Sequence, residues 1–170
     1  MIDQAEKVLI HLKYKDLEKS FSATPEKAWI FIHNFFSEFL PSFEIANKLL
    51  LTVNLQKLAK DCEGLIAFSP EGANLLVHRK RLTDNETLLL WLLANYLGSK
   101  LGLLTSEAIS KEELQMKLGK SSKIASTRLG ELVKSDMVIK MIDEKYKITT
   151  FGIDQMQVDI IPKVRAKLNA

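Results

Sequence analysis

The sequence predicts a mixed α+β protein, on three observations. Short stretches alternate apolar and polar residues or flank a turn, as strands do. Longer stretches open with helix-capping residues and carry apolar residues at helical spacing. The 170-residue chain is 46% hydrophobic and 26% charged, an ordinary composition for a globular protein with a real core. Its single cysteine, Cys62, excludes an internal disulfide and fits a reducing compartment.

The first expected elements are a hairpin and a helix. Val8–Tyr14 alternates apolar and polar residues, with one break, and an extended stretch at Leu17–Phe21 completes a hairpin. Thr24-Pro25-Glu26 then opens a helix, because threonine caps well and proline suits the first helical position. This helix runs to about Leu40. Its aromatic stripe, Trp29–Phe39, is typical of a core, but it also fits an oligomer or partner surface or the lining of a ligand pocket.

The middle of the chain adds helices and a second hairpin. The basic run Arg79-Lys80-Arg81 then reads as a linker between two domains. We therefore expect a small N-terminal α/β module of hairpins and helices at residues 1–82, and a second domain at residues 83–170. The expected elements before the linker are helices at Phe43–Leu51 and Leu55–Cys62, and strands at Leu65–Phe68 and Asn74–His78 around the turn Ser69-Pro70-Glu71-Gly72.

The second domain begins with a long helix and a shorter one. Thr83 and Glu86 have the spacing of a capping box, in which each side chain bonds to the backbone N–H of the other residue. The helix that they open is expected at Asp84–Leu101. The same spacing recurs at Ser110–Glu113 and opens a short helix that ends at Leu118.

A tight turn joins this short helix to the next one. Gly119 suits a left-handed helix end, and Ser122 is placed to cap a helix over Lys123–Lys134. Two short helices joined by a turn that contains glycine form the helix-turn-helix pattern, in which the second helix enters the DNA groove. The buried stripe of this second helix is expected to comprise Ile124, Ala125, Leu129 and Leu132.

A hairpin and a terminal helix complete the chain. Strands at Val138–Ile142 and Tyr146–Thr150 flank the polar turn Asp143-Glu144-Lys145, and a hairpin in this position is a wing. From Gly152 to about Lys167 apolar residues recur at helical spacing, and Pro162 is expected to kink or split that helix.

Two motifs in this half resemble winged-helix regulators of the MarR and related types. They are Leu129-x-x-Leu132-Val133-Lys134-x-x-Met137-Val138 and Tyr146-Lys147-Ile148-Thr149-Thr150-Phe151-Gly152. The resemblance covers about residues 84–152 and implies a C-terminal winged helix-turn-helix fold. Asp136 departs from it, since the family usually has glycine there. Terminal helices build the dimer in MarR-type proteins, so the resemblance implies a homodimer formed through Ile153–Leu168.

The charge pattern indicates double-stranded DNA as the partner. Lys117–Lys134 holds five cations and one anion, a local net charge of +4 against +3 for the whole chain. We predict a DNA-binding transcriptional regulator in which lysines anchor phosphates and Arg128 contacts a guanine in bidentate fashion. The residues expected to contact DNA are Lys120, Ser121, Ser122, Lys123, Ser126, Thr127, Arg128, Lys134 and Lys145.

Two other functions stay open at this stage. The winged helix could serve as a protein–protein interaction module without DNA binding, since a fold does not settle a function. The N-terminal module could be an enzyme or a ligand sensor, although no catalytic motif supports this reading. We expect no cofactor and no metal site, because the three histidines and Cys62 lack ligand spacing.

The sequence also carries signals about location. Its first residues lack the basic and apolar regions of a signal peptide. The longest apolar stretch, Leu88–Ala94, falls far short of the ~20 residues that span a bilayer. We therefore expect no membrane partner and a cytoplasmic, nucleoid-associated protein.

Overall fold

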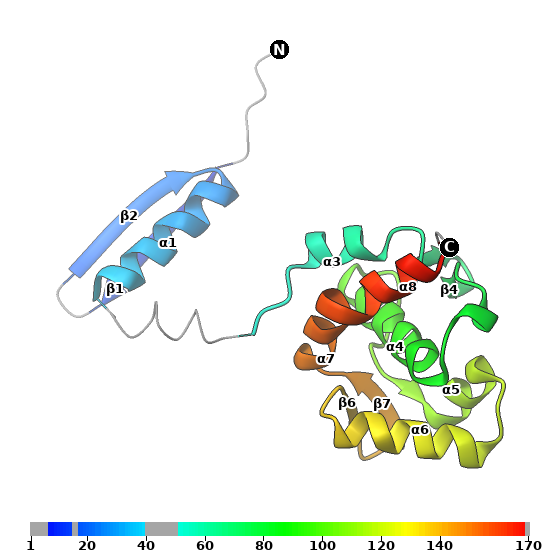
Figure 1. Cartoon of the computed structure of the whole chain (residues 1–170). Helices are drawn as coiled ribbons and strands as arrows, with labels where there is room; N and C mark the ends of the chain where they lie inside the picture. The colour runs from blue at the N-terminus through cyan, green and yellow to red at the C-terminus, as the bar shows by residue number, and fades with distance from the viewer. Residues whose placement is uncertain (1–6, 15–16, 40–50, 169–170) are drawn as a thin grey trace. The chain divides into compact units, whose positions relative to one another are not determined.

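The structure of the chain, a computed structural model, describes residues 7–14, 17–39 and 51–168. It is a mixed α+β structure of helices and several small antiparallel sheets, which confirms the predicted class (Figure 1). The chain forms two compact units, Met1–Leu50 and Leu51–Ala170. The helix expected at Phe43–Leu51 lies, apart from Leu51, outside the described residues. Arg79–Arg81, the expected boundary, lies within the second unit.

The first unit is a hairpin covered by one helix. Strands β1 (Val8–Tyr14) and β2 (Leu17–Ala23) pair antiparallel, with Ile10 opposite Phe21. Helix α1 (Pro25–Phe39) packs on the hairpin, and the Phe31 ring stacks on Phe21 with centroids 4.4 Å apart. The described side chains of this unit that are buried are Ala23, Ala28 and Phe35.

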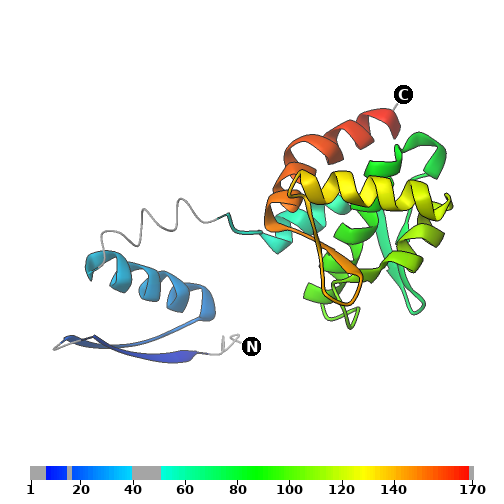
Figure 2. The same ribbon diagram turned by 90° about the horizontal axis from the view of Figure 1, so that it is seen from below.

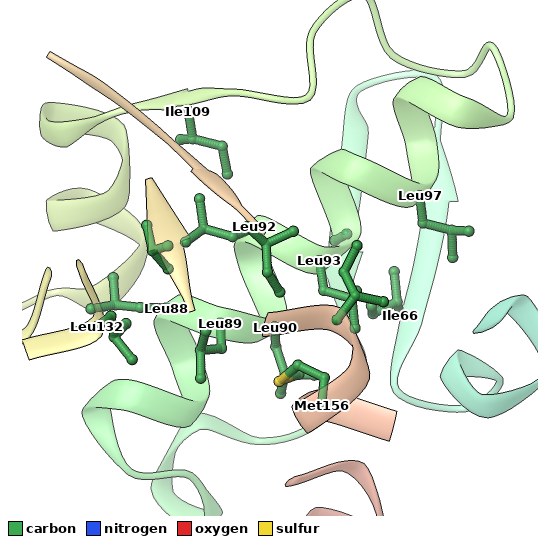
Figure 3. Packing of buried hydrophobic residues seen from close by; sticks show 14 of the residues in the cluster. Ile66, Leu88, Leu89, Leu90, Leu92, Leu93, Leu97, Ile109, Leu132 and Met156 are labelled. Atoms are coloured by element: carbon green, nitrogen blue, oxygen red, sulfur yellow. The ribbon is translucent and has the colours of Figure 1, made fainter. Parts of the chain in front are cut away.

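Helix α4 (Asp84–Lys100) is the centre of the second unit. Its leucines are buried on every side of the helix, as expected for a helix that other elements surround. Figure 3 shows Leu88 pointing toward Leu132 of a following helix, and Leu93 pointing toward Ile66 of a strand. The predicted capping box is confirmed, because Thr83 and Glu86 exchange both hydrogen bonds at the helix start.

The residues before α4 pack against it. Helix α3 (Leu55–Cys62) and the hairpin of β3 (Ile66–Ser69) and β4 (Gly72–Leu75) contribute side chains to the same core as α4. The basic run is a short 3-10 helix, η1 (Arg79–Arg81), rather than a linker in extended form. Nη1 of Arg81 donates a hydrogen bond of 2.6 Å to the backbone oxygen of Lys167, which ties η1 to the C-terminal helix.

After α4 the chain forms two short helices and a small sheet. Helices α5 (Lys111–Leu118) and α6 (Ser122–Lys134) pack on each other and on α4. Strands β5 (Ile109–Ser110), β6 (Val138–Lys140) and β7 (Lys145–Ile148) form a three-stranded antiparallel sheet in the order β5-β7-β6. The hairpin strands β6 and β7 are each shorter than the five residues expected from the sequence.

Two left-handed residues shape the chain around this hairpin. Asp136 has a φ of 57°, so the aspartate occupies the conformation that glycine adopts most easily. Its backbone oxygen accepts a hydrogen bond of 2.7 Å from the Thr149 hydroxyl, which links the two ends of the hairpin. Glu144 has a φ of 58° at the tip, where the Met141 N–H donates to the Lys145 oxygen. Asp136 therefore makes the turn that leads into the hairpin although it is not glycine.

The C-terminal segment is an interrupted helix. Helix α7 (Thr150–Gln155) leads through a π-helical turn, η2 (Met156–Ile160), into α8 (Ile161–Leu168). The helix begins before Gly152 because the Thr149 hydroxyl accepts from the Gly152 N–H at 2.8 Å and caps it. The widened turn lies just before Pro162, which lacks an N–H and crowds the preceding turn of a regular helix.

The apolar stripe of this segment packs within its own chain. Ile153, Met156, Ile161 and Val164 are all buried in the core of the second unit. The resemblance to MarR-type regulators implied a homodimer formed through this segment. Since these four side chains are covered within one chain, they are not available to a partner, and the homodimer itself stays a prediction.

None of the helices among residues 7–14, 17–39 and 51–168 is both long enough and apolar enough to cross a lipid bilayer. Over the same ranges, histidine, cysteine and acidic side chains do not gather in groups that could hold a metal ion.

Candidate nucleic-acid interface

The turn between α5 and α6 is built by Gly119 and Ser121. Gly119 is left-handed, with a φ of 56°, and its N–H donates to the oxygens of Gln115 and Met116. The Ser121 hydroxyl then accepts from the Ile124 N–H at 3.4 Å and caps α6. The prediction that Ser122 caps this helix was wrong by one residue, because Ser121 already has the extended backbone of a cap. Ser122 is therefore the first helical residue.

The buried face of α6 is formed by Ala125, Leu129 and Leu132. These residues follow the helical spacing i, i+4 and i+7. Ile124 was expected in the same stripe, but its side chain is 39% exposed. The expectation was wrong because Ile124 lies about 100° around the helix from Ala125, at the edge of the stripe.

The opposite face of α6 carries most of the predicted contact residues. Lys123, Thr127 and Lys134 are exposed, and Ser126 is half-buried. The hydroxyls of Ser126 and Thr127 donate to the backbone oxygens of Ser122 and Lys123, at 2.8 and 2.9 Å. Each hydroxyl oxygen keeps lone pairs that can accept a hydrogen bond from a base or a bridging water. α6 is drawn in yellow across the face turned to the viewer in Figure 2.

Arg128 is held by two carboxylates. Its Nη1 lies 3.0 Å from both carboxylate oxygens of Glu131, and its Nε lies 3.8 Å from Asp84 of α4. The hydrogen bond to Glu131 raises the pKa of Arg128 above its ordinary value, and the same bond lowers the pKa of Glu131. In this arrangement Nη1 and Nε face carboxylates, so a bidentate guanine contact through these nitrogens requires an exchange of partners.

The lysines of the β6–β7 hairpin are also paired. Lys140 pairs with Glu144, Lys145 with Asp143 at 2.9 Å, and Lys147 with Glu107 at 2.9 Å. Lys145, a predicted contact residue, therefore shares its charge with the acidic tip of its own hairpin. These pairs leave the hairpin close to neutral, and a neutral hairpin gains little from the field of a phosphate backbone.

One group of exposed cations without a carboxylate partner lies at the start of α6. Within residues 7–14, 17–39 and 51–168, Lys120 and Lys123 are exposed and have no carboxylate partner. The same holds for Arg79 and Lys80 of η1. In the sequence both residues read as part of a linker, and neither was predicted as a site residue. The basic triplet Arg79-Lys80-Arg81 was the signal that could have indicated them. It lies far from Lys120 along the chain, so the sequence does not show that the two are close in space.

The hairpin exposes apolar side chains instead of free charge. Ile142 at its tip is fully exposed, and Ile139 and Met141 are 49% and 38% exposed. Such a patch is typical of a protein-contacting surface more than of a phosphate-contacting one.

Comparison of the chain with protein-family models, with curated proteins and with solved structures finds no match.

Proposed function

We propose that the second unit contains a winged helix-turn-helix and that the protein binds double-stranded DNA to regulate transcription. The order of elements supports this proposal: α5, a glycine turn, α6, and then the β6–β7 hairpin that pairs with β5. In that arrangement α6 is the recognition helix and the hairpin is the wing. The buried face of α6 packs on α4 and α5, so its polar face can enter the groove.

One observation carries the proposal: exposed cations without carboxylate partners lie at the N-terminal end of α6. Lys120 precedes the Ser121 cap and Lys123 lies in the first helical turn. The first N–H groups of a helix face outward, so they attract phosphate together with these ammonium groups. Lys120 and Lys123 therefore anchor the backbone of the duplex at the mouth of the groove.

Base contact is assigned to the next turns of α6. Ser126, Thr127 and Arg128 follow Lys123 along the polar face, with Lys134 at the far end for a second phosphate. Arg128 contacts guanine only after its ion pair with Glu131 breaks. Its contribution to the binding free energy is therefore the difference in free energy between the guanine contact and the ion pair. The carboxylates of Glu131 and Asp84 thus lower the affinity for non-cognate DNA. They favour sites where the guanine contact outweighs the lost ion pairs.

We place the homodimer contact on the first unit. Trp29 and Ile30 of α1 are 70% and 58% exposed, while Phe31 and Phe35 of the same helix face the hairpin. A helix that exposes large apolar side chains beside its buried face is stabilised when a second surface covers them. A hairpin with one helix buries too little to be stable alone, and a second copy supplies the missing cover. Two recognition helices then read two half-sites.

Salt-dependent DNA binding tests the proposal. We expect the full chain to bind a fluorescein-labelled random-sequence duplex, with log K falling linearly against log[salt]. Lys123→Ala is expected to weaken binding equally on all sequences and to reduce the slope by about one per protomer. Lys57→Ala, which removes an exposed lysine of α3, is the matched control and leaves the slope unchanged. Absence of duplex binding by the wild type overturns the proposal.

A second candidate is a protein-interaction module, favoured by the apolar wing. Ile139, Met141 and Ile142 form an exposed patch beside lysines that are already paired. Under this alternative, Ile142→Ser abolishes partner binding, while Lys123→Ala has no effect. Under the DNA proposal the order is reversed, so the two substitutions separate the candidates.

A further inference from the structure

A pocket beside the start of α6 combines cations from two parts of the chain. Its volume is about 460 Å³, and its lining includes Arg79 and Lys80 of η1, His78, Asp84 and Lys120. Residues 79 and 120 are far apart in sequence, and the packing of η1 against the α5–α6 turn brings them together. The pocket therefore exists only in the folded second unit.

The contact between Arg79 and Gly119 fixes this arrangement. The Arg79 guanidinium lies so close to Gly119 that a Cβ on the glycine would collide with Nη1. Gly119 is left-handed and lacks a side chain, so it can end α5 and leave room for the Arg79 guanidinium to contact its backbone. The next residue is Lys120, which joins Arg79 in the lining of the pocket.

The charges of the pocket are largely unsatisfied within the described chain. The side chains of Arg79, Lys80 and Lys120 are exposed and have no carboxylate partner among residues 7–14, 17–39 and 51–168. Arg81 differs, because it is bound to the end of α8. Asp84 contributes the opposing charge, and its carboxylate lies 3.8 Å from Arg128. The balance of the pocket is therefore positive.

His78 adds a further donor. Its Nδ1 accepts from the Lys80 N–H at 3.3 Å, which leaves the hydrogen of the neutral ring on Nε2. A guanidinium, two ammonium groups and an imidazole N–H around a concave surface match the oxygens of a phosphate group. The cationic part of the lining, beside the single carboxylate of Asp84, therefore suits an anionic phosphate group.

We propose that this pocket, with Lys120 in its lining, binds a backbone phosphate of the DNA duplex next to the phosphate that Lys123 anchors at the start of α6. This proposal rests on the proposed function. It extends the DNA-contacting surface from α6 to η1 and gives Arg79 and Lys80 a role that was not predicted from the basic triplet in the sequence. Because the contact is to a phosphate, it raises affinity for all sequences alike.

The test uses the full chain and the double variant Arg79→Ala/Lys80→Ala. We expect weaker binding to a labelled random-sequence duplex and a slope of log K against log[salt] reduced by about one per protomer. Arg79→Lys/Lys80→Arg keeps the charges and should restore most of the slope. Lys57→Ala is the control for removal of an exposed lysine elsewhere. Circular dichroism should show an unchanged fold, since both altered side chains are exposed.

The outcomes separate this proposal from the proposed function. If the wild type binds DNA and the double variant keeps its affinity and slope, the pocket proposal is overturned and the DNA-binding function stands. If the wild type does not bind DNA, the function fails and the pocket proposal with it. A second arm titrates inorganic phosphate and follows thermal melting. Stabilisation that the double variant loses, combined with unchanged DNA binding, assigns the pocket to a free anion and overturns the duplex assignment.

Discussion

Nη1 of Arg128 lies 3.0 Å from both carboxylate oxygens of Glu131, one turn further along α6. The same carboxylate also accepts from the Asn85 side chain at 3.3 Å, so Glu131 is oriented by two elements. The residue that the sequence marks as the strongest base reader is thus held back by its own helix.

Glu131→Gln is therefore expected to strengthen DNA binding. The substitution removes an anion from the groove-facing helix and releases Arg128, so we expect several-fold tighter binding at low salt, with a smaller gain at high salt. Anisotropy titrations at two salt concentrations measure this effect.

Arg128→Ala should weaken binding to a preferred site roughly ten- to hundredfold and affect random DNA much less. Equal losses on both DNAs would assign Arg128 to phosphate instead.

Gly119→Ala is expected to destabilise the second unit and to displace Arg79. A non-glycine residue in the left-handed region costs about 1–2 kcal/mol, and the collision with the guanidinium adds to that cost. Gly102→Ala is a matched control, because Gly102 is also left-handed, with a φ of 71°, but has open space around it. Urea unfolding of both variants measures the difference. Equal losses of unfolding free energy would mean that Arg79 moves aside freely.

Trp29→Glu is expected to turn the homodimer into a monomer. The 70% exposed indole then carries a charge into the proposed interface, while the side that faces the hairpin is unchanged. Sedimentation equilibrium measures the oligomeric state. Ile142→Glu, at the fully exposed tip of the wing, is the control and should leave the dimer intact. A wild-type chain that stays monomeric at tens of micromolar would contradict the dimer proposal.

Met156→Ala is expected to lower the free energy of unfolding by about 2–5 kcal/mol without changing the oligomeric state. The reason is that Met156 is fully buried in the core of its own chain. Val158→Ala in the same π-helical turn should cost far less, since Val158 is 69% exposed. Thermal melting and sedimentation together check this prediction. A dimer that dissociates in Met156→Ala while the fold persists would restore the C-terminal segment as the interface.

Stability is expected to fall in acid partly through Glu107. A hydrogen bond from Lys147 lowers the pKa of its carboxyl below the ordinary value of 4.5, and a further bond from Lys100 acts in the same direction against partial burial. A lowered pKa in the folded state stabilises the fold above the unfolded pKa, and this contribution disappears as the pH falls through the folded value. Glu107→Gln should therefore flatten the pH dependence of the unfolding free energy below about pH 5.

Capping residues and turn glycines allowed most elements of the second unit to be predicted. Thr83 and Glu86 form their box, Gly119 ends α5, and the α5–α6 pair and the following hairpin lie where the spacing placed them. These features depend on contacts within about four residues, which a sequence displays directly. The errors in this region are small, namely the cap at Ser121 and the exposed Ile124.

The sequence by itself determined the class, the element order and the basic character of the region around α6. Only the tertiary structure decided which of those charges are free. Arg128 meets Asp84 of α4, Lys147 meets Glu107, and Arg79 meets Gly119, across separations that no local pattern records. It also decided that Ile153 and Met156 face their own core. Charge pairing and burial depend on which distant elements pack together, and periodicity reports only which face of a helix is apolar.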